Sequence, residues 1–226
     1  MINDIKKGIK LMRYGYGLKS IVVVSIIYII CGFLVLGMLL FASGDFKFAT
    51  QGMLLLIVPI MPVQLLHSLN ASKMTLSSPM RKQLQTLIPS AISCIGMLTI
   101  YIFFILYCLL AMFINPGRIG VLCGDIAYAA LGAALFIVYL SLAYKYMIVC
   151  SIAFITLYMA FCGVYVSMPE IEFLNNANIF TFICVAALGI LFIVIFGFVG
   201  YLLTLLTYKA PMSKYSQNVY LRKELQ

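Results

Sequence analysis

The residues of this chain that could carry chemistry are few and widely spaced. One histidine, His67, and six acidic residues occur among 226 positions. His67 has no acidic residue near it in the sequence and lies at the end of a long apolar stretch. We therefore interpret it as a residue of the membrane interface rather than as a catalytic residue. The cysteines are Cys31, Cys94, Cys108, Cys123, Cys150, Cys162 and Cys184. They form no Cys-x-x-Cys pair and lie mostly in apolar stretches, which is typical of buried apolar side chains rather than of metal ligands or redox pairs.

Sequence motifs of catalysis are missing as well. The chain has no His-Glu-x-x-His, no Gly-x-Ser-x-Gly, no Walker A pattern and no pair of acids spaced along one helix. We therefore expect no catalytic residue and no metal or cofactor bound by this chain. A small membrane enzyme that uses His67 with a cysteine or an acid is the weaker alternative.

Long apolar stretches decide the fold class. The mean hydropathy is +1.13, with 65% hydrophobic and 9% charged residues, against roughly 25% charged residues in soluble domains. A helix needs about 20 apolar residues to cross the hydrocarbon core of a bilayer. The predicted spans are Ser20–Phe41, Phe48–Leu69, Leu87–Ile114, Asp125–Tyr144, Tyr146–Met168 and Ile179–Tyr208. The sequence thus predicts an all-α integral membrane protein, with residues 1–226 as a single transmembrane domain of six helices.

The basic residues give the expected orientation. Thirteen of the fifteen lie on the side of the two termini, and only Lys47 and Arg118 fall in the opposite loops. The thirteen are Lys6, Lys7, Lys10, Arg13, Lys19, Lys73, Arg81, Lys82, Lys145, Lys209, Lys214, Arg222 and Lys223. Since Lys and Arg concentrate in cytoplasmic segments, both termini, including the tail 209–226, are expected in the cytoplasm. Anionic lipid headgroups fit this charge, whereas nucleic acid does not, because no basic patch lies away from the membrane-flanking positions.

The first nineteen residues predict an amphipathic helix. Apolar residues recur at steps of three and four, namely Ile2, Ile5, Ile9, Met12 and Tyr16. Basic residues occupy the remaining positions, as in helices that lie in the headgroup layer. The alternative is a basic tail that only sets the topology.

Two prolines interrupt the second span. Pro59 and Pro62 each remove one N–H group and free a carbonyl one turn earlier, at Leu55 and Val58. The sequence predicts a kinked or locally opened helix here. We treat the two prolines as a candidate gate, with a static kink as the alternative.

Small residues mark a helix-packing interface in the fourth span. The residues are Ala129, Ala130, Gly132, Ala133 and Ala134. Their spacing allows close approach of another helix, either within the chain or from a second subunit. Gly189, Gly197 and Gly200 in the sixth span leave the same choice open.

Charged residues are expected only outside the spans or at their ends. Proton-coupled transporters normally carry ionisable groups near the middle of the membrane. No such relay is predicted here, so any uphill transport would draw its energy from another chain. A passive channel is also disfavoured, because no ring of polar residues follows a span.

The layout resembles the membrane subunit of an ABC-2 type transporter. The resemblance rests on the basic N-terminal helix, six spans with both ends inside, and a long cytoplasmic connection between spans two and three. Within that connection, Ser77-Ser78-Pro79-Met80-Arg81-Lys82 is similar to the Leu-Pro-Val-Ser-Arg pattern of such permeases.

The resemblance implies a permease subunit of an ABC exporter in a bacterial cell membrane. It would pair with a second permease subunit, identical or different, and with cytosolic ABC ATPase subunits that carry Mg-ATP. Residues Ser77 to Lys82 would form the helix that couples to the ATPase. The cargo implied is a hydrophobic or amphipathic peptide, lipid or drug. The alternative is a six-span membrane scaffold without catalytic activity.

Overall fold

The computed structural model of the chain describes residues 2–14, 18–41, 55–71, 79–114, 117, 119–167 and 177–211. Apart from short turns, the described part is helical and contains no strand. Its elements are α1 (Ile2–Leu11), the 3-10 turn η1 (Met12–Tyr14), α2 (Leu18–Phe41), α4 (Ile60–Ala71), α6 (Arg81–Gln85), α7 (Leu87–Ile114), α8 (Ile119–Ala143), α9 (Met147–Ser167) and α11 (Ile179–Thr207). Five of these, α2, α7, α8, α9 and α11, are long and apolar enough to cross a membrane.

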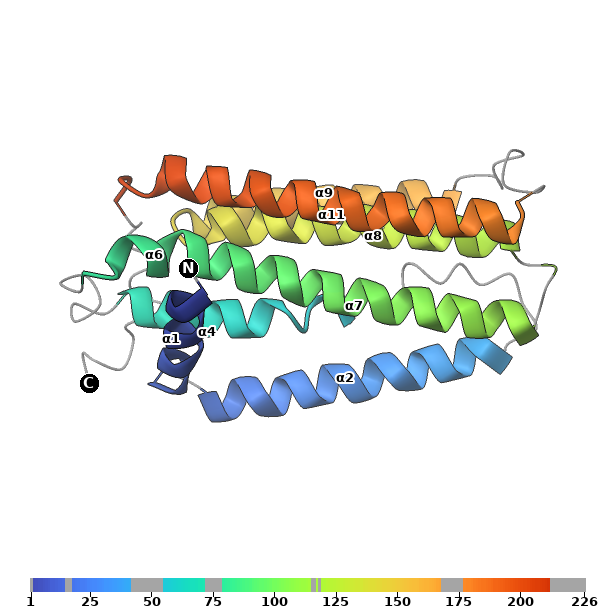
Figure 1. Cartoon of the computed structure of the whole chain (residues 1–226), viewed down its shortest axis with the longest axis horizontal. Coiled ribbons are helices and arrows are strands. Elements are labelled where there is room, and N and C mark those ends of the chain that lie inside the picture. Colours follow the sequence, from blue (N-terminus) through green and yellow to red (C-terminus); the bar gives the residue numbers. More distant parts are fainter. Residues whose placement is uncertain are drawn as a thin grey trace.

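The long helices run along one axis, and α1 lies across them at one end (Figure 1). Helix α8 is central and packs against α7, α9 and α11. Helices α2 and α9 are peripheral, and Val149, Ile152 and Met159 on α9 are 63–70% exposed. Such broad apolar exposure is unusual for a soluble protein and is compatible with a multi-pass membrane protein.

The core forms where large side chains meet glycines and alanines. Tyr101 of α7 is fully buried, and its hydroxyl lies where a side chain at Gly189 of α11 would begin. A methyl group at Gly200 would lie 2.7 Å from Ser141 Oγ of α8. The small residues predicted as a packing interface, Ala129, Ala130, Gly132, Ala133 and Ala134, are all buried inside the chain. Close helix approach through small residues therefore occurs within this bundle.

Most predicted spans agree with the helices. Helix α7 has the predicted bounds, and α2, α9 and α11 begin and end within two residues of theirs. In the second span, a continuous helix runs only over Ile60–Ala71, and residues 48–54 lie outside the described part. The total of six spans and the cytoplasmic placement of the termini remain predictions.

Helix α8 begins six residues before the predicted start at Asp125. Asp125 therefore lies inside the helix, about 9 Å from its first residue at 1.5 Å per residue, and is only 1% exposed. The predicted start of this helix is therefore six residues too late, whereas the position of Asp125 relative to the membrane remains a prediction. Because α8 is the central helix, neighbouring helices cover even its second turn.

Candidate functional site: the basic end of the bundle

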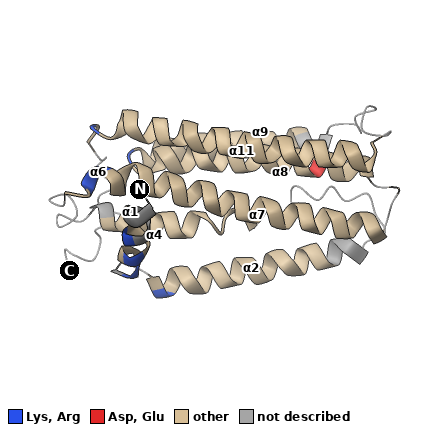
Figure 2. Cartoon of the chain, in the orientation of Figure 1, with Lys and Arg blue, Asp and Glu red and all other residues tan. Residues whose placement is uncertain are grey.

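The described basic residues, blue in Figure 2, gather at one end of the bundle. They are Lys7, Lys10, Arg13, Lys19, Arg81, Lys82, Lys145 and Lys209. Asp125, the one acidic residue whose side chain is described, lies toward the opposite end (Figure 2). We call the end with the cations the basic end.

Helix α1 is held against the basic end by a small apolar face. Gly8 is buried, and a methyl group there would lie 2.7 Å from Ile88 Cγ2 of α7. Leu11 and Met12 pack against a buried cluster made of Leu66, Leu84 and Ile88. Ile9, which we predicted on the apolar face, is 51% exposed. Gly8, Leu11 and Met12 thus form the face that packs on the bundle, whereas Ile9 of the predicted apolar face stays exposed.

Helix α6 carries the described part of the predicted coupling segment. Pro79, Arg81 and Lys82 are exposed, and Met80 is half-buried. One turn later Leu84 is buried in the same apolar cluster that holds α1. Ser77 and Ser78 lie outside the described residues. The short helix thus has an outward cationic face and an inward apolar face.

Hydroxyl groups join α6 and α7 to the end of α11. Thr86 Oγ1 donates to the Lys82 carbonyl at 2.7 Å, and Ser90 Oγ donates to the Thr86 carbonyl at 2.9 Å. Ser90 Oγ also lies 3.3 Å from Thr204 Oγ1 of α11. We did not predict this junction. The four-residue spacing of Thr86 and Ser90 was visible in the sequence, but nothing there indicated Thr204.

Hydrogen bonds from Lys145 link the turn between α8 and α9 to the end of α11. The Lys145 side chain is buried, and Nζ donates to the Ala210 carbonyl at 2.8 Å and to the Tyr208 carbonyl at 3.5 Å. Carbonyls at the end of a helix have no partner within the helix, so a cation there satisfies them. Burial lowers the pKa of Lys145 from its ordinary value, and the nearby Arg81 lowers it further. His67 lies at the same end, buried, with its ring centroid 4.9 Å from that of Tyr144.

The helix break predicted at the prolines is present. The chain makes a turn over residues 57–59 before α4 begins. The two carbonyls that the prolines free are both satisfied: the Leu55 carbonyl accepts from Val58 N at 3.1 Å, and the Val58 carbonyl accepts from Met61 N at 3.2 Å. Movement of this break as a gate remains a prediction.

An apolar cavity of about 310 Å³ lies beside the break, between α2 and α7. Leu55 lines it together with Leu36 and Phe103. A second apolar groove, of about 330 Å³, lies between α8 and α11. Among the described residues, no group of three His, Cys, Asp or Glu side chains could hold a metal ion.

Comparison of the chain with protein-family models, with curated proteins and with solved structures gives no match. The described part of the chain defines only a class: it is helical, and five of its helices are long and apolar enough to cross a membrane.

Proposed function

We propose that the chain is the transmembrane permease subunit of an ATP-driven ABC exporter. It would act in a bacterial cell membrane with a second permease subunit, and a separate cytosolic ATPase would bind Mg-ATP and supply the energy. This proposal carries forward the resemblance of the layout and of the segment Ser77 to Lys82. The observation that supports it best is the position of α6.

Helix α6 has the two properties that a coupling element needs. Its cations Arg81 and Lys82 are exposed at the basic end, where an acidic surface of a cytosolic partner can reach them. Its other side is anchored, because Leu84 is buried and Thr86 bonds back to the Lys82 carbonyl. A displacement of α6 would therefore move α7, and through Ser90 and Thr204 also α11.

The apolar cavities support a hydrophobic or amphipathic cargo. A dry cavity of about 150 Å³ lined by apolar side chains binds benzene rather than water. The cavity between α2 and α7 is about 310 Å³ and has a mostly apolar lining, so it suits a hydrocarbon group. Its wall includes Leu55 at the helix break, so movement at Pro59 and Pro62 would change its shape.

Charge reversal on α6 tests the coupling role. In the variant Arg81→Glu/Lys82→Glu, co-purification of a soluble ATPase in mild detergent should be lost while the bundle stays folded. The matched control is Lys7→Glu/Lys10→Glu, which makes the same charge change on exposed residues at the same end. Retained association in the α6 variant, or equal loss in both variants, would contradict the assignment of α6.

Reconstitution tests the energy source. In proteoliposomes the chain alone should neither hydrolyse ATP nor accumulate a solute from a pH gradient, and addition of the co-purified ATPase should give vanadate-sensitive hydrolysis. An ATPase without its catalytic carboxylate is the control. Uphill transport by the chain alone would favour a secondary transporter, and Asp125 would then be the first residue to test. If no ATPase binds and no solute is transported, the result would favour the alternative of a membrane scaffold without catalytic activity.

A further inference from the structure

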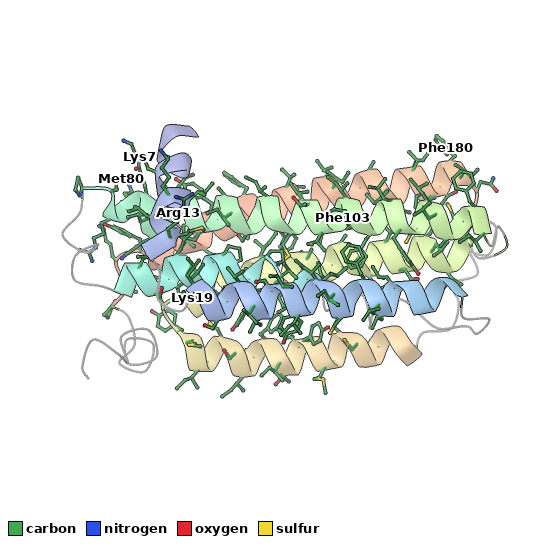
Figure 3. All side chains as sticks on the ribbon, turned by 90° about the horizontal axis from the view of Figure 1, so that it is seen from below. Lys7, Arg13, Lys19, Met80, Phe103 and Phe180 are labelled. Carbon is green, nitrogen blue, oxygen red and sulfur yellow. The ribbon has the colours of Figure 1, made fainter. Side chains whose placement is uncertain are left out.

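The cations of α1 are separate from those of α6 in position and in surroundings. Figure 3 shows Lys7 and Arg13 on the helix that crosses the bundle. Arg13 is close to the level of Lys19 at the start of α2, and Met80 at the start of α6 lies nearer the extreme end. Since α2 is long and apolar enough to span a membrane, its first residues mark the depth of the headgroup layer. Helix α1 lies at this depth.

The shape of α1 suits a lipid surface better than a protein surface. Its inward face is occupied, because Gly8 lies against Ile88 and Leu11 packs on the apolar cluster. The rest of the helix projects past the side of the bundle, as Figure 3 shows. Ile9 is 51% exposed, and the exposed Lys10 and Arg13 follow it by one and four residues on the same side of the segment. An apolar side chain next to cations, on a helix at headgroup depth, is the chemistry of a helix that lies in the membrane interface.

The charge of this segment calls for an anionic partner. Residues 1–19 contain five basic residues and one acidic residue, Asp4, so their side chains sum to a net charge of +4. Among the side chains that the structure describes at the basic end, none is acidic. Arginine and lysine near a bilayer surface are drawn to the phosphates of anionic lipids.

We propose that Lys7, Lys10 and Arg13 form a binding site for the headgroups of anionic phospholipids in the cytoplasmic leaflet, with Ile9 inserted beside the acyl chains. The α1 segment would thus bind lipid, while the cations of α6 stay free for a protein partner. The proposal does not depend on the permease assignment, because it rests on the position and charge of α1 and not on α6.

Lipid binding by two charge-matched variants tests the proposal. The α1 variant is Lys7→Gln/Lys10→Gln/Arg13→Gln. The control is Arg81→Gln/Lys82→Gln/Lys209→Gln, which removes three exposed cations from the same end. Purified protein in neutral detergent is titrated with phosphatidylglycerol or with phosphatidylcholine. Bound lipids are counted by native mass spectrometry, and the melting temperature is followed in parallel.

We expect phosphatidylglycerol to bind the wild type and the control in preference to phosphatidylcholine. At about one kcal/mol per basic residue, the α1 variant should bind it roughly 100-fold more weakly. All three proteins should melt alike in phosphatidylcholine, which shows that they are folded. Equal losses in both variants would overturn the proposal, because general basicity would then explain the binding. Stabilisation of the wild type by inorganic phosphate alone would also overturn it, in favour of a simple anion site.

Discussion

The contact between Tyr101 and Gly189 yields the sharpest test of the packing between α7 and α11. Tyr101 Oη is buried and has no hydrogen-bond partner among the described residues. A methyl group at Gly189 would collide with this hydroxyl, and it would lie 2.6 Å from Tyr101 Cζ and 3.1 Å from Cε1. The obstacle is a rigid ring, so the two helices would have to separate to admit it.

The expected free energies follow from this geometry. Overpacking costs about 1–3 kcal/mol, and we place Gly189→Ala near the upper end because ring atoms cannot yield. Alanine has a better helix propensity than glycine and stabilises the helix by about 1 kcal/mol. The net effect of Gly189→Ala is then a decrease of about 2 kcal/mol in the free energy of unfolding. Tyr101→Phe removes an unsatisfied buried hydroxyl and should stabilise the protein by about 1 kcal/mol.

The double variant separates these effects. Phenylalanine removes the nearest atom but leaves Cζ in place, so Tyr101→Phe should rescue Gly189→Ala only in part, with a coupling of about 1 kcal/mol. The assay is unfolding by SDS in mixed micelles, followed by circular dichroism. Gly163→Ala on α9 is the control, because a methyl group there meets nothing within 4 Å. Equal effects of Gly163→Ala and Gly189→Ala would refute the described approach of α7 and α11, and destabilisation by Tyr101→Phe would reveal a partner for the hydroxyl.

Two further predictions concern the basic end. Thr204→Val and Ser90→Ala should show a coupling of about 0.6 kcal/mol in a double-mutant cycle, which is the usual size for hydrogen bonds between membrane helices. The control is Thr156→Val, which loses only a hydrogen bond within its own helix. It should show no coupling to Ser90→Ala. Burial lowers the pKa of Lys145 below 10.5, so the unfolded chain binds more protons than the folded chain between the two values. Unfolding measured from pH 7 to 10 should therefore show the wild type gaining stability with rising pH relative to Lys145→Gln, and a gain with falling pH would contradict the described burial.

The sequence predicted those parts of the fold that depend on local chemistry. The bounds of α7 follow from a long, mostly apolar run without a charged residue, which ends just before Asn115-Pro116-Gly117. The break before α4 follows from the missing N–H groups of Pro59 and Pro62. In both cases the cause lies within a few residues of its effect, so the local sequence is enough to predict the feature.

The parts that could not be predicted depend on contacts between distant segments. Asp125 suggested the end of a span, but burial by neighbouring helices permits a carboxyl group there. Periodicity identified an apolar face on the first helix, whereas the fit of Gly8 on Ile88 decides which face packs. The bond between Ser90 and Thr204 joins residues 114 positions apart, and no local pattern indicates it.

The central position of α8 has a consequence for biogenesis. Its buried small residues, such as Ala130 and Ala133, face neighbours that include α11, and 64 residues separate the end of α8 at Ala143 from the end of α11 at Thr207. At ribosomal speeds of about 5–20 residues per second, roughly 3–13 s pass between the completion of the two helices. During this interval the nascent chain displays the packing face of α8 to lipid, to the insertion machinery and to membrane proteases. Substitutions on this face therefore act on the yield of inserted protein as well as on the stability of the finished bundle.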